Sequence, residues 1–201
     1  QGIHDNYGIM MKALVPATSV KYADISFIIG VGAFLYGFVQ PFFGLLALKK
    51  SNALVMLLGI AMIVAGLVVT PLCRTFWTML PFFGIILPAG TGAVSFGIVM
   101  SALTPILGEK KAAAVSGIVQ ASAGVGDALM SPALQALISW RGIFFSMTSF
   151  AVMMACTLPV VIWIGVKNSN LPKDERESAN TAGSESKETL WGIVRTAFQN
   201  P

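Results

Sequence analysis

The sequence predicts an all-α fold, namely a polytopic bundle of transmembrane helices. Of the 201 residues, 55% are hydrophobic and only 11% are charged, whereas soluble domains carry about 25% charged residues. The mean hydropathy is +0.77. The apolar residues form runs of about 20, the length at which a helix crosses about 30 Å of hydrocarbon. Helix is the expected conformation because lipid offers no partner to an unpaired backbone, and these runs lack the period of two typical of strands.

The apolar runs predict five complete spans and one partial span. The complete spans are 25–47, 53–72, 76–101, 112–138 and 143–166, and the segment 2–16 reads as the second half of a truncated first span. The chain begins with neither a methionine nor a signal peptide, so we expect a fragment of a longer protein. We expect a bundle over 1–166, a polar cytoplasmic linker over 167–188 and an amphipathic helix over 189–201 that begins a missing second half.

The basic residues indicate how the bundle lies in the membrane. Nine of the thirteen Lys and Arg residues fall on the same side as the loop that holds Lys49 and Lys50. The positive-inside rule assigns that side to the cytoplasm and predicts a multi-pass protein of the plasma (inner) membrane. The formal net charge of +4 is therefore explained by topology. No nucleic-acid partner is expected.

The residues that would support catalysis or metal binding are scarce. Cys73 and Cys156 have no metal-ligand spacing, and His4 is the single histidine. Neither a Ser-His-Asp order nor a phosphate-binding glycine loop is present. The sequence therefore predicts no metal site, no cofactor and no enzymatic activity.

Asp127 is the clearest candidate for a functional residue. It lies near the centre of the span 112–138, where a carboxylate is costly unless it faces water or a partner. Gln120 lies seven residues earlier on nearly the same helix face, which predicts a polar stripe toward a central cavity. Burial raises a carboxyl pKa, so Asp127 is a candidate proton carrier. The alternative is a protonated carboxyl that only packs helices together.

A second polar cluster comprises His4, Asp5 and Asn6 in the partial first span. A histidine beside an aspartate suits proton relay or the binding of a substrate carboxylate. Lys12 extends this surface and would attract an anion. The alternative is a frayed, water-exposed end of the chain. Gln40 and Ser95 are further candidates for hydrogen bonding in a cavity, although both residue types also occur as ordinary packing residues in helices.

Short motifs give the chain a resemblance to a known family. The segment Gly44-Leu45-Leu46-Ala47-Leu48-Lys49-Lys50 is similar to the loop signature that the major facilitator superfamily carries after its second span, although Leu48 stands at its acidic position. The sequence Trp140-Arg141-Gly142-Ile143-Phe144 resembles the turn that the family places before its sixth span. The segment 84–92, rich in glycine and without an arginine, resembles the oxalate/formate antiporter and monocarboxylate branches.

This resemblance implies the N-terminal six-helix half of such a transporter, with its first helix truncated. It also implies alternating access to a substrate bound between two halves of a protein that is monomeric when full length. Together with Lys12 and His4, it favours a small organic anion as the substrate, with proton coupling or exchange. A drug or sugar carrier is the alternative. A channel subunit, an intramembrane enzyme or a non-transporting membrane scaffold is less favoured.

Overall fold

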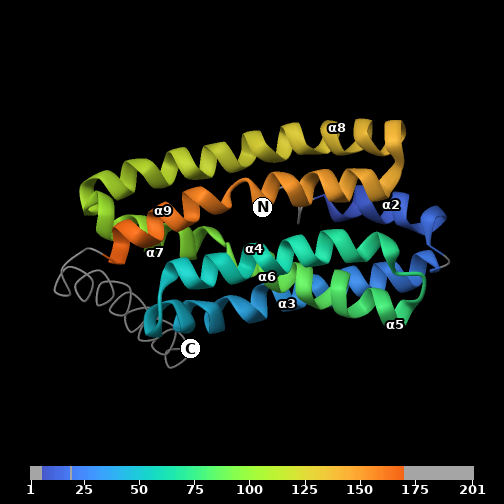
Figure 1. Ribbon diagram of the computed structural model, residues 1–201, viewed down its shortest axis with the longest axis horizontal. Coiled ribbons are helices and arrows are strands. Elements are labelled where there is room, and N and C mark those ends of the chain that lie inside the picture. Colours follow the sequence, from blue (N-terminus) through green and yellow to red (C-terminus); the bar gives the residue numbers. More distant parts are fainter. Residues whose placement is uncertain (1–5, 19, 170–201) are drawn as a thin grey trace, which may run out of the picture.

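The computed structural model describes residues 6–18 and 20–169, and these residues form a bundle of helices (Figure 1). The chain passes through α2 (Tyr7–Ala17), α3 (Tyr22–Lys49), α4 (Asn52–Val69), η1 (Thr70–Leu72), α5 (Phe76–Met79), η2 (Leu80–Ile86), α6 (Leu87–Ala93), α7 (Phe96–Leu107), α8 (Glu109–Ala155) and α9 (Leu158–Ser169). The described residues include no strand. The predicted all-α class is confirmed.

Within the described residues, four stretches of helix are long and apolar enough to cross a membrane. They are Tyr22–Ala47, Asn52–Leu72, Phe76–Thr104 and Lys111–Ile164. The last stretch, at 54 residues, contains the span expected at 112–138 and most of the one expected at 143–166, ending at Ile164. The chain reverses direction inside it at Gly142, where φ is +81°, and runs back alongside itself into α9 (Figure 1). Glycine adopts such a φ without the steric cost that a side chain would add.

Helix α9 extends three residues beyond the expected end of the sixth span at 166, to Ser169. The rest of the expected linker and the expected amphipathic helix at 189–201 lie outside the described residues.

The turns fall at two opposite ends of the bundle. The turns from α3 to α4 and from α7 to α8 lie at one end (Figure 1). Lys49, Lys50 and Lys111 lie in or next to these two turns. The turn from η1 to α5 and the reversal of α8 lie at the other end. This arrangement agrees with the distribution of basic residues on which the expected orientation depends.

Helix α4 lies at the centre of the bundle. It contacts α3, α6, α7, α8 and α9 as well as η1 and η2. Its backbone comes very close to that of α6 at Gly59 and Gly90, where neither residue carries a side chain. Small residues that bring backbones together are typical of helix packing in membranes.

Large apolar side chains cover the outside of the bundle. Phe34 is 69% exposed on α3, and Trp77 and Trp140 are 79% and 67% exposed near the end that carries the α8 reversal. Exposed apolar side chains on this scale are expected where the solvent is lipid, and tryptophan is enriched at the membrane interface. The chain is therefore an integral, multi-pass membrane protein.

The predicted fourth span, 76–101, is interrupted in two places. The first is a seven-residue π-helical segment, η2, in which the N–H of Leu87 donates to the carbonyl of Phe82. Pro81 and Pro88 lack the N–H that regular α-helical bonding needs there. The second is a break at Val94 and Ser95, where Ser95 has an extended ψ of 158°. The sequence predicts one span over 76–101 with local loosening at Pro81 and Pro88, but it does not predict the break at Val94 and Ser95.

Candidate functional site

A cavity of about 120 Å³ lies where the fourth span is broken. Four polar side chains line it, from α3, α6, the α6–α7 junction and α8: Tyr36, Thr91, Ser95 and Gln120. The apolar part of the wall consists of Val94, Phe96, Val99, Val119 and Ala123. Among these described lining residues none is charged. The cavity thus combines hydrogen-bonding groups with an apolar wall, as small-molecule sites commonly do.

The helix break places the end of α6 and the start of α7 beside the cavity, because Val94, Ser95 and Phe96 line it. Val94 N–H donates to the Thr91 carbonyl and Ser95 N–H donates to the Gly92 carbonyl, at 3.3 and 3.2 Å, so α6 ends in a tighter turn. Helix α7 begins at once, with Ser95 as its N-cap residue. The first N–H groups of a helix lack partners within the helix and carry a partial positive charge. The amino end of α7 therefore adds positive potential beside Ser95 and Phe96.

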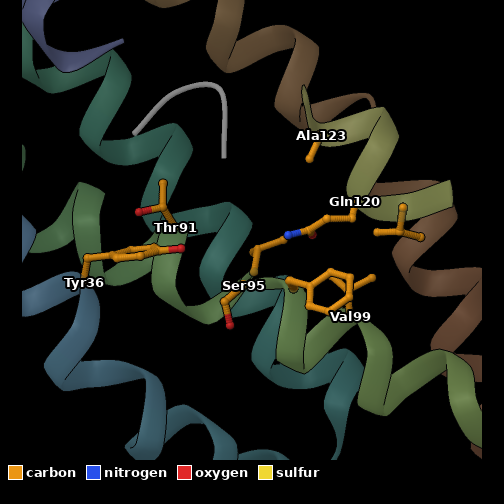
Figure 2. A pocket seen from close by; sticks show the side chains of 9 residues that line it. Tyr36, Thr91, Ser95, Val99, Gln120 and Ala123 are labelled. Carbon is orange, nitrogen blue, oxygen red and sulfur yellow. The ribbon is translucent and has the colours of Figure 1, made fainter. Parts of the chain in front are cut away.

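The polar side chains reach the cavity from opposite sides. Figure 2 shows Gln120 extending from α8 and Tyr36 from α3, with the amide nitrogen of Gln120 and the hydroxyl of Tyr36 both directed into the space between them. Thr91 is 7% exposed, and its Oγ1 donates to the Pro88 carbonyl at 2.9 Å. The Thr91 hydroxyl thus keeps a lone pair as an acceptor, while the amide and the phenol supply donors.

A second polar group joins α2 to α8. Ser131 Oγ lies 2.7 Å from Asn6 Oδ1, to which it donates, and 3.2 Å from the backbone carbonyl oxygen of Asp127. Asn6 is 4% exposed, and Asp127 is half-buried. The hydrogen bond brings two predicted site residues, Asn6 and Asp127, into one neighbourhood.

The predicted site residues are thus divided between two places. Gln120 and Ser95 line the cavity, but Asp127 is not among its lining residues. Seven residues of helix advance about 10 Å along its axis, so a shared helix face does not place two side chains in one cavity. Gln40 is half-buried and packs against Gly92, where a Cβ added to the glycine would lie 3.7 Å from Gln40 Cγ.

None of the remaining predicted residues is among the described residues that line the cavity. His4 and Asp5 fall outside the described residues. Gly44 lies within α3, and a Cβ added there would meet nothing within 4 Å. Lys49 is the last residue of α3, and Lys50 is its exposed C-cap, whose N–H donates to the Leu46 carbonyl at 2.9 Å. Among the described residues, no cluster of three or more His, Cys, Asp or Glu residues has a geometry that would hold a metal.

Tyr36 and Thr91 line the cavity but were not among the residues predicted from the sequence. Each lies four residues before a polar residue that was predicted, Gln40 and Ser95 respectively. Tyr36 shares a helix face with Gln40, although Gln40 does not line the cavity, whereas the helix break separates Thr91 from Ser95. Neither Tyr36 nor Thr91 carries a charge. A hydroxyl residue within an apolar span commonly serves only in helix packing, so its sequence signal is weak.

The comparisons with known proteins agree with this architecture. The family model described as Major Facilitator Superfamily matches residues 4–201. A search of the curated proteins found no match to the chain. The matched region includes every described helix and both polar groups. The chain therefore belongs to the major facilitator superfamily, a family of membrane transporters.

Proposed function

We propose that this protein is a secondary active transporter that moves a small organic anion, such as a carboxylate, by alternating access. The observation that carries the proposal is the cavity of about 120 Å³ at the broken fourth span, lined by Tyr36, Thr91, Ser95 and Gln120. Its size suits a solute of a few heavy atoms or one end of a larger solute. In the proposal, these side chains form the part of the substrate site that this bundle contributes.

The donors around the cavity favour an anion. The hydroxyls of Tyr36 and Ser95 and the amide of Gln120 donate hydrogen bonds to a carboxylate, and no described lining residue is acidic. The amino end of α7 adds the positive end of a helix dipole. Broken helices whose amino ends face an anionic group of the substrate are a recurrent device in transporters.

Proton coupling is the second element of the proposal, and it depends on Asp127. A carboxylate near the middle of a span costs about 3 kcal/mol, which favours a functional reason for its presence. Protonation of Asp127 removes its charge and changes the free-energy difference between conformations. A proton gradient would then drive accumulation of the anion.

The test is counterflow in proteoliposomes that contain the full-length protein. Radiolabelled oxalate, formate, lactate and a panel of sugars are offered with and without an imposed pH gradient. We expect saturable exchange of a carboxylate and its accumulation when the pH gradient is imposed. Gln120→Ala should weaken the exchange, whereas Gln135→Ala, an exposed glutamine on the same helix, should not. Equal effects of the two variants would count against the cavity as the site.

A carrier of uncharged solutes is the second candidate, and one observation favours it. The described cavity wall holds hydroxyl and amide groups but no cationic side chain, and such a lining also suits a sugar or a polar drug. Movement of a sugar with no exchange of any carboxylate would select this reading. Silence across the whole panel would favour a non-transporting membrane scaffold. For the full-length protein we propose a monomer in the plasma (inner) membrane.

A further inference from the structure

The first residues of α2 lie between the two polar groups of the bundle. Asn6 directly precedes the helix, and Tyr7 is its first residue. Each is only 4% exposed. One side of this pair faces α8 near Asp127, and the other side faces the wall of the cavity. Two consecutive residues, Asn6 and Tyr7, thus lie between the polar group around Asp127 and the cavity.

Asn6 makes the contact with α8. Its Oδ1 accepts the hydroxyl hydrogen of Ser131, whose Oγ also lies 3.2 Å from the carbonyl oxygen of Asp127, one helical turn earlier. A serine hydroxyl carries a single hydrogen, which it shares between these two acceptors. A shift of the Asp127 turn therefore alters the hydrogen bond that holds Asn6.

Tyr7 makes the contact with the cavity. Its ring packs at a tilted angle on Phe83, with the ring centroids 5.2 Å apart. Its hydroxyl interacts with the Thr91 side chain, and Tyr36 is a further neighbour within electrostatic range. Thr91 and Tyr36 both line the cavity. A displacement of Tyr7 therefore changes the surroundings of Thr91 and Tyr36, two of the four polar side chains in that wall.

We propose that Asn6 and Tyr7 are positioning residues that couple Asp127 on α8 to the substrate cavity. A change at Asp127 alters the bond from Ser131 to Asn6, and the start of α2 transmits that change to Thr91 and Tyr36. The inference rests on the proposed function, in which Asp127 couples transport to protons. It adds the physical route by which the state of that carboxyl reaches the substrate.

Among the described residues, few charged side chains lie on the elements that pack against this part of α8. Within α2, Lys12 is the only charged residue, and its side chain is exposed. Helix α7 carries no charged residue. The other charged residues of α8 lie near its start and at Arg141, beside the reversal. Within the described part of the chain, Asp127 is therefore the charged residue of α8 nearest in sequence to Ser131, which bonds Asn6.

The experiment compares exchange with proton-driven accumulation in proteoliposomes of the full-length protein, with the carboxylate identified by counterflow as the substrate. Tyr7→Phe and Ser131→Ala each remove one hydroxyl and keep the apolar packing. Two coupled sites commonly influence each other by about tenfold. We therefore expect each variant to lower accumulation driven by the pH gradient by about tenfold while exchange without a gradient stays near the wild-type rate. Tyr22→Phe, at the 60% exposed start of α3, is the matched control and should change neither.

Two results would overturn the inference, and they differ from failure of the proposed function. Suppose that Asp127→Asn abolishes accumulation, but Tyr7→Phe and Ser131→Ala accumulate substrate as the wild type does. Asp127 would then couple transport to protons without the aid of α2. A parallel loss of exchange and accumulation in Tyr7→Phe would also overturn it, because Tyr7 would then act as part of the binding site. If Asp127→Asn itself leaves accumulation intact, the proton-coupling proposal fails and the inference fails with it.

Discussion

Gly59 on α4 and Gly90 on α6 face each other so closely that a Cβ on Gly90 would lie 2.8 Å from the Gly59 carbonyl oxygen and 2.9 Å from the Ile63 backbone nitrogen. Backbone atoms cannot rotate away as the end of a long side chain can. Because Thr91 follows Gly90 directly, this contact also sets the distance between the central helix and the wall of the cavity.

We predict that Gly90→Ala lowers the stability of the bundle by about 1–3 kcal/mol, the usual cost of forcing an extra group into a packed interior. The measurement is the midpoint of thermal unfolding of the protein in detergent. Gly97→Ala is the matched control, because a Cβ there would meet nothing within 4 Å, and alanine is the better helix former. Equal midpoints for Gly90→Ala and the wild type would show that α4 and α6 separate readily.

Much of the fold follows from the sequence because membrane insertion leaves few alternatives. Runs of apolar residues predicted the spans, and the turn before the sixth span was expected where Gly142 reverses the chain with φ at +81°. The break at Val94 and Ser95 was not predicted, since neither residue is a strong helix breaker. Gly90 and Gly92, just before the break, pack closely against α4 and α3, a tertiary contact that local sequence pattern does not reveal.

The candidate site was predictable only in part. Ser95 and Gln120 stood out because polar side chains are unusual in apolar spans, and both line the cavity. The bond between Asn6 and Ser131 joins positions 125 residues apart, and local pattern cannot pair such positions. The sequence also places Asp127 on the same helix face as Gln120. It does not indicate that the two turns of helix between them keep Asp127 out of the cavity.

We predict that Tyr36→Phe weakens substrate binding while leaving the protein folded. The change removes one donor from the cavity, and a neutral hydrogen bond contributes about 0.5–1.5 kcal/mol. The substrate concentration for half-maximal counterflow should therefore rise by about three- to tenfold. Thermal unfolding should stay near the wild-type midpoint, because the ring remains in place. An unchanged half-maximal concentration would remove the Tyr36 hydroxyl from the substrate site.

Asp127→Asn should abolish uptake driven by a pH gradient without lowering the amount of protein in the membrane. Asparagine keeps the size of the side chain and cannot exchange a proton in the physiological range. The measurements are accumulation in proteoliposomes with an imposed gradient and the yield of folded protein. Asp24→Asn provides the control, because Asp24 lies in the first turn of α3, where an acidic residue interacts favourably with the helix dipole. Wild-type accumulation by Asp127→Asn would exclude Asp127 from coupling.

The orientation of the bundle can be tested by labelling single cysteines. Ser51 and Arg74 are both exposed and lie in turns at opposite ends. In a background of Cys73→Ala and Cys156→Ala, we predict that a membrane-impermeant maleimide labels Arg74→Cys in intact cells. Ser51→Cys should be labelled only after the cells are permeabilised, because the positive-inside rule assigns its turn to the cytoplasm. The reverse pattern would invert the assigned topology.

Cys73, in the turn between η1 and α5, should react slowly with thiol reagents near neutral pH. It is 4% exposed, and its Sγ lies within hydrogen-bonding distance of the carbonyls of Val69 and Thr78, at 3.4 and 3.2 Å. Burial raises the pKa of the Cys73 thiol above its ordinary value. The reactive thiolate is therefore scarcer than for a free cysteine at the same pH.

The sign of the expected pH dependence follows from this raised pKa. As the pH rises from 7 to about 9, an ordinary thiol with a pKa of about 8.5 passes its midpoint, whereas the Cys73 thiol gains its thiolate only at higher pH. The rate of alkylation of Cys73 should therefore lag behind that of Arg74→Cys in a Cys73→Ala background, and the lag should persist through pH 9. Unfolding in detergent and denaturant should equalise the two rates, because it removes the burial that raises the pKa. Equal rates in the folded proteins at pH 7 would mean that the turn exposes Cys73 to water.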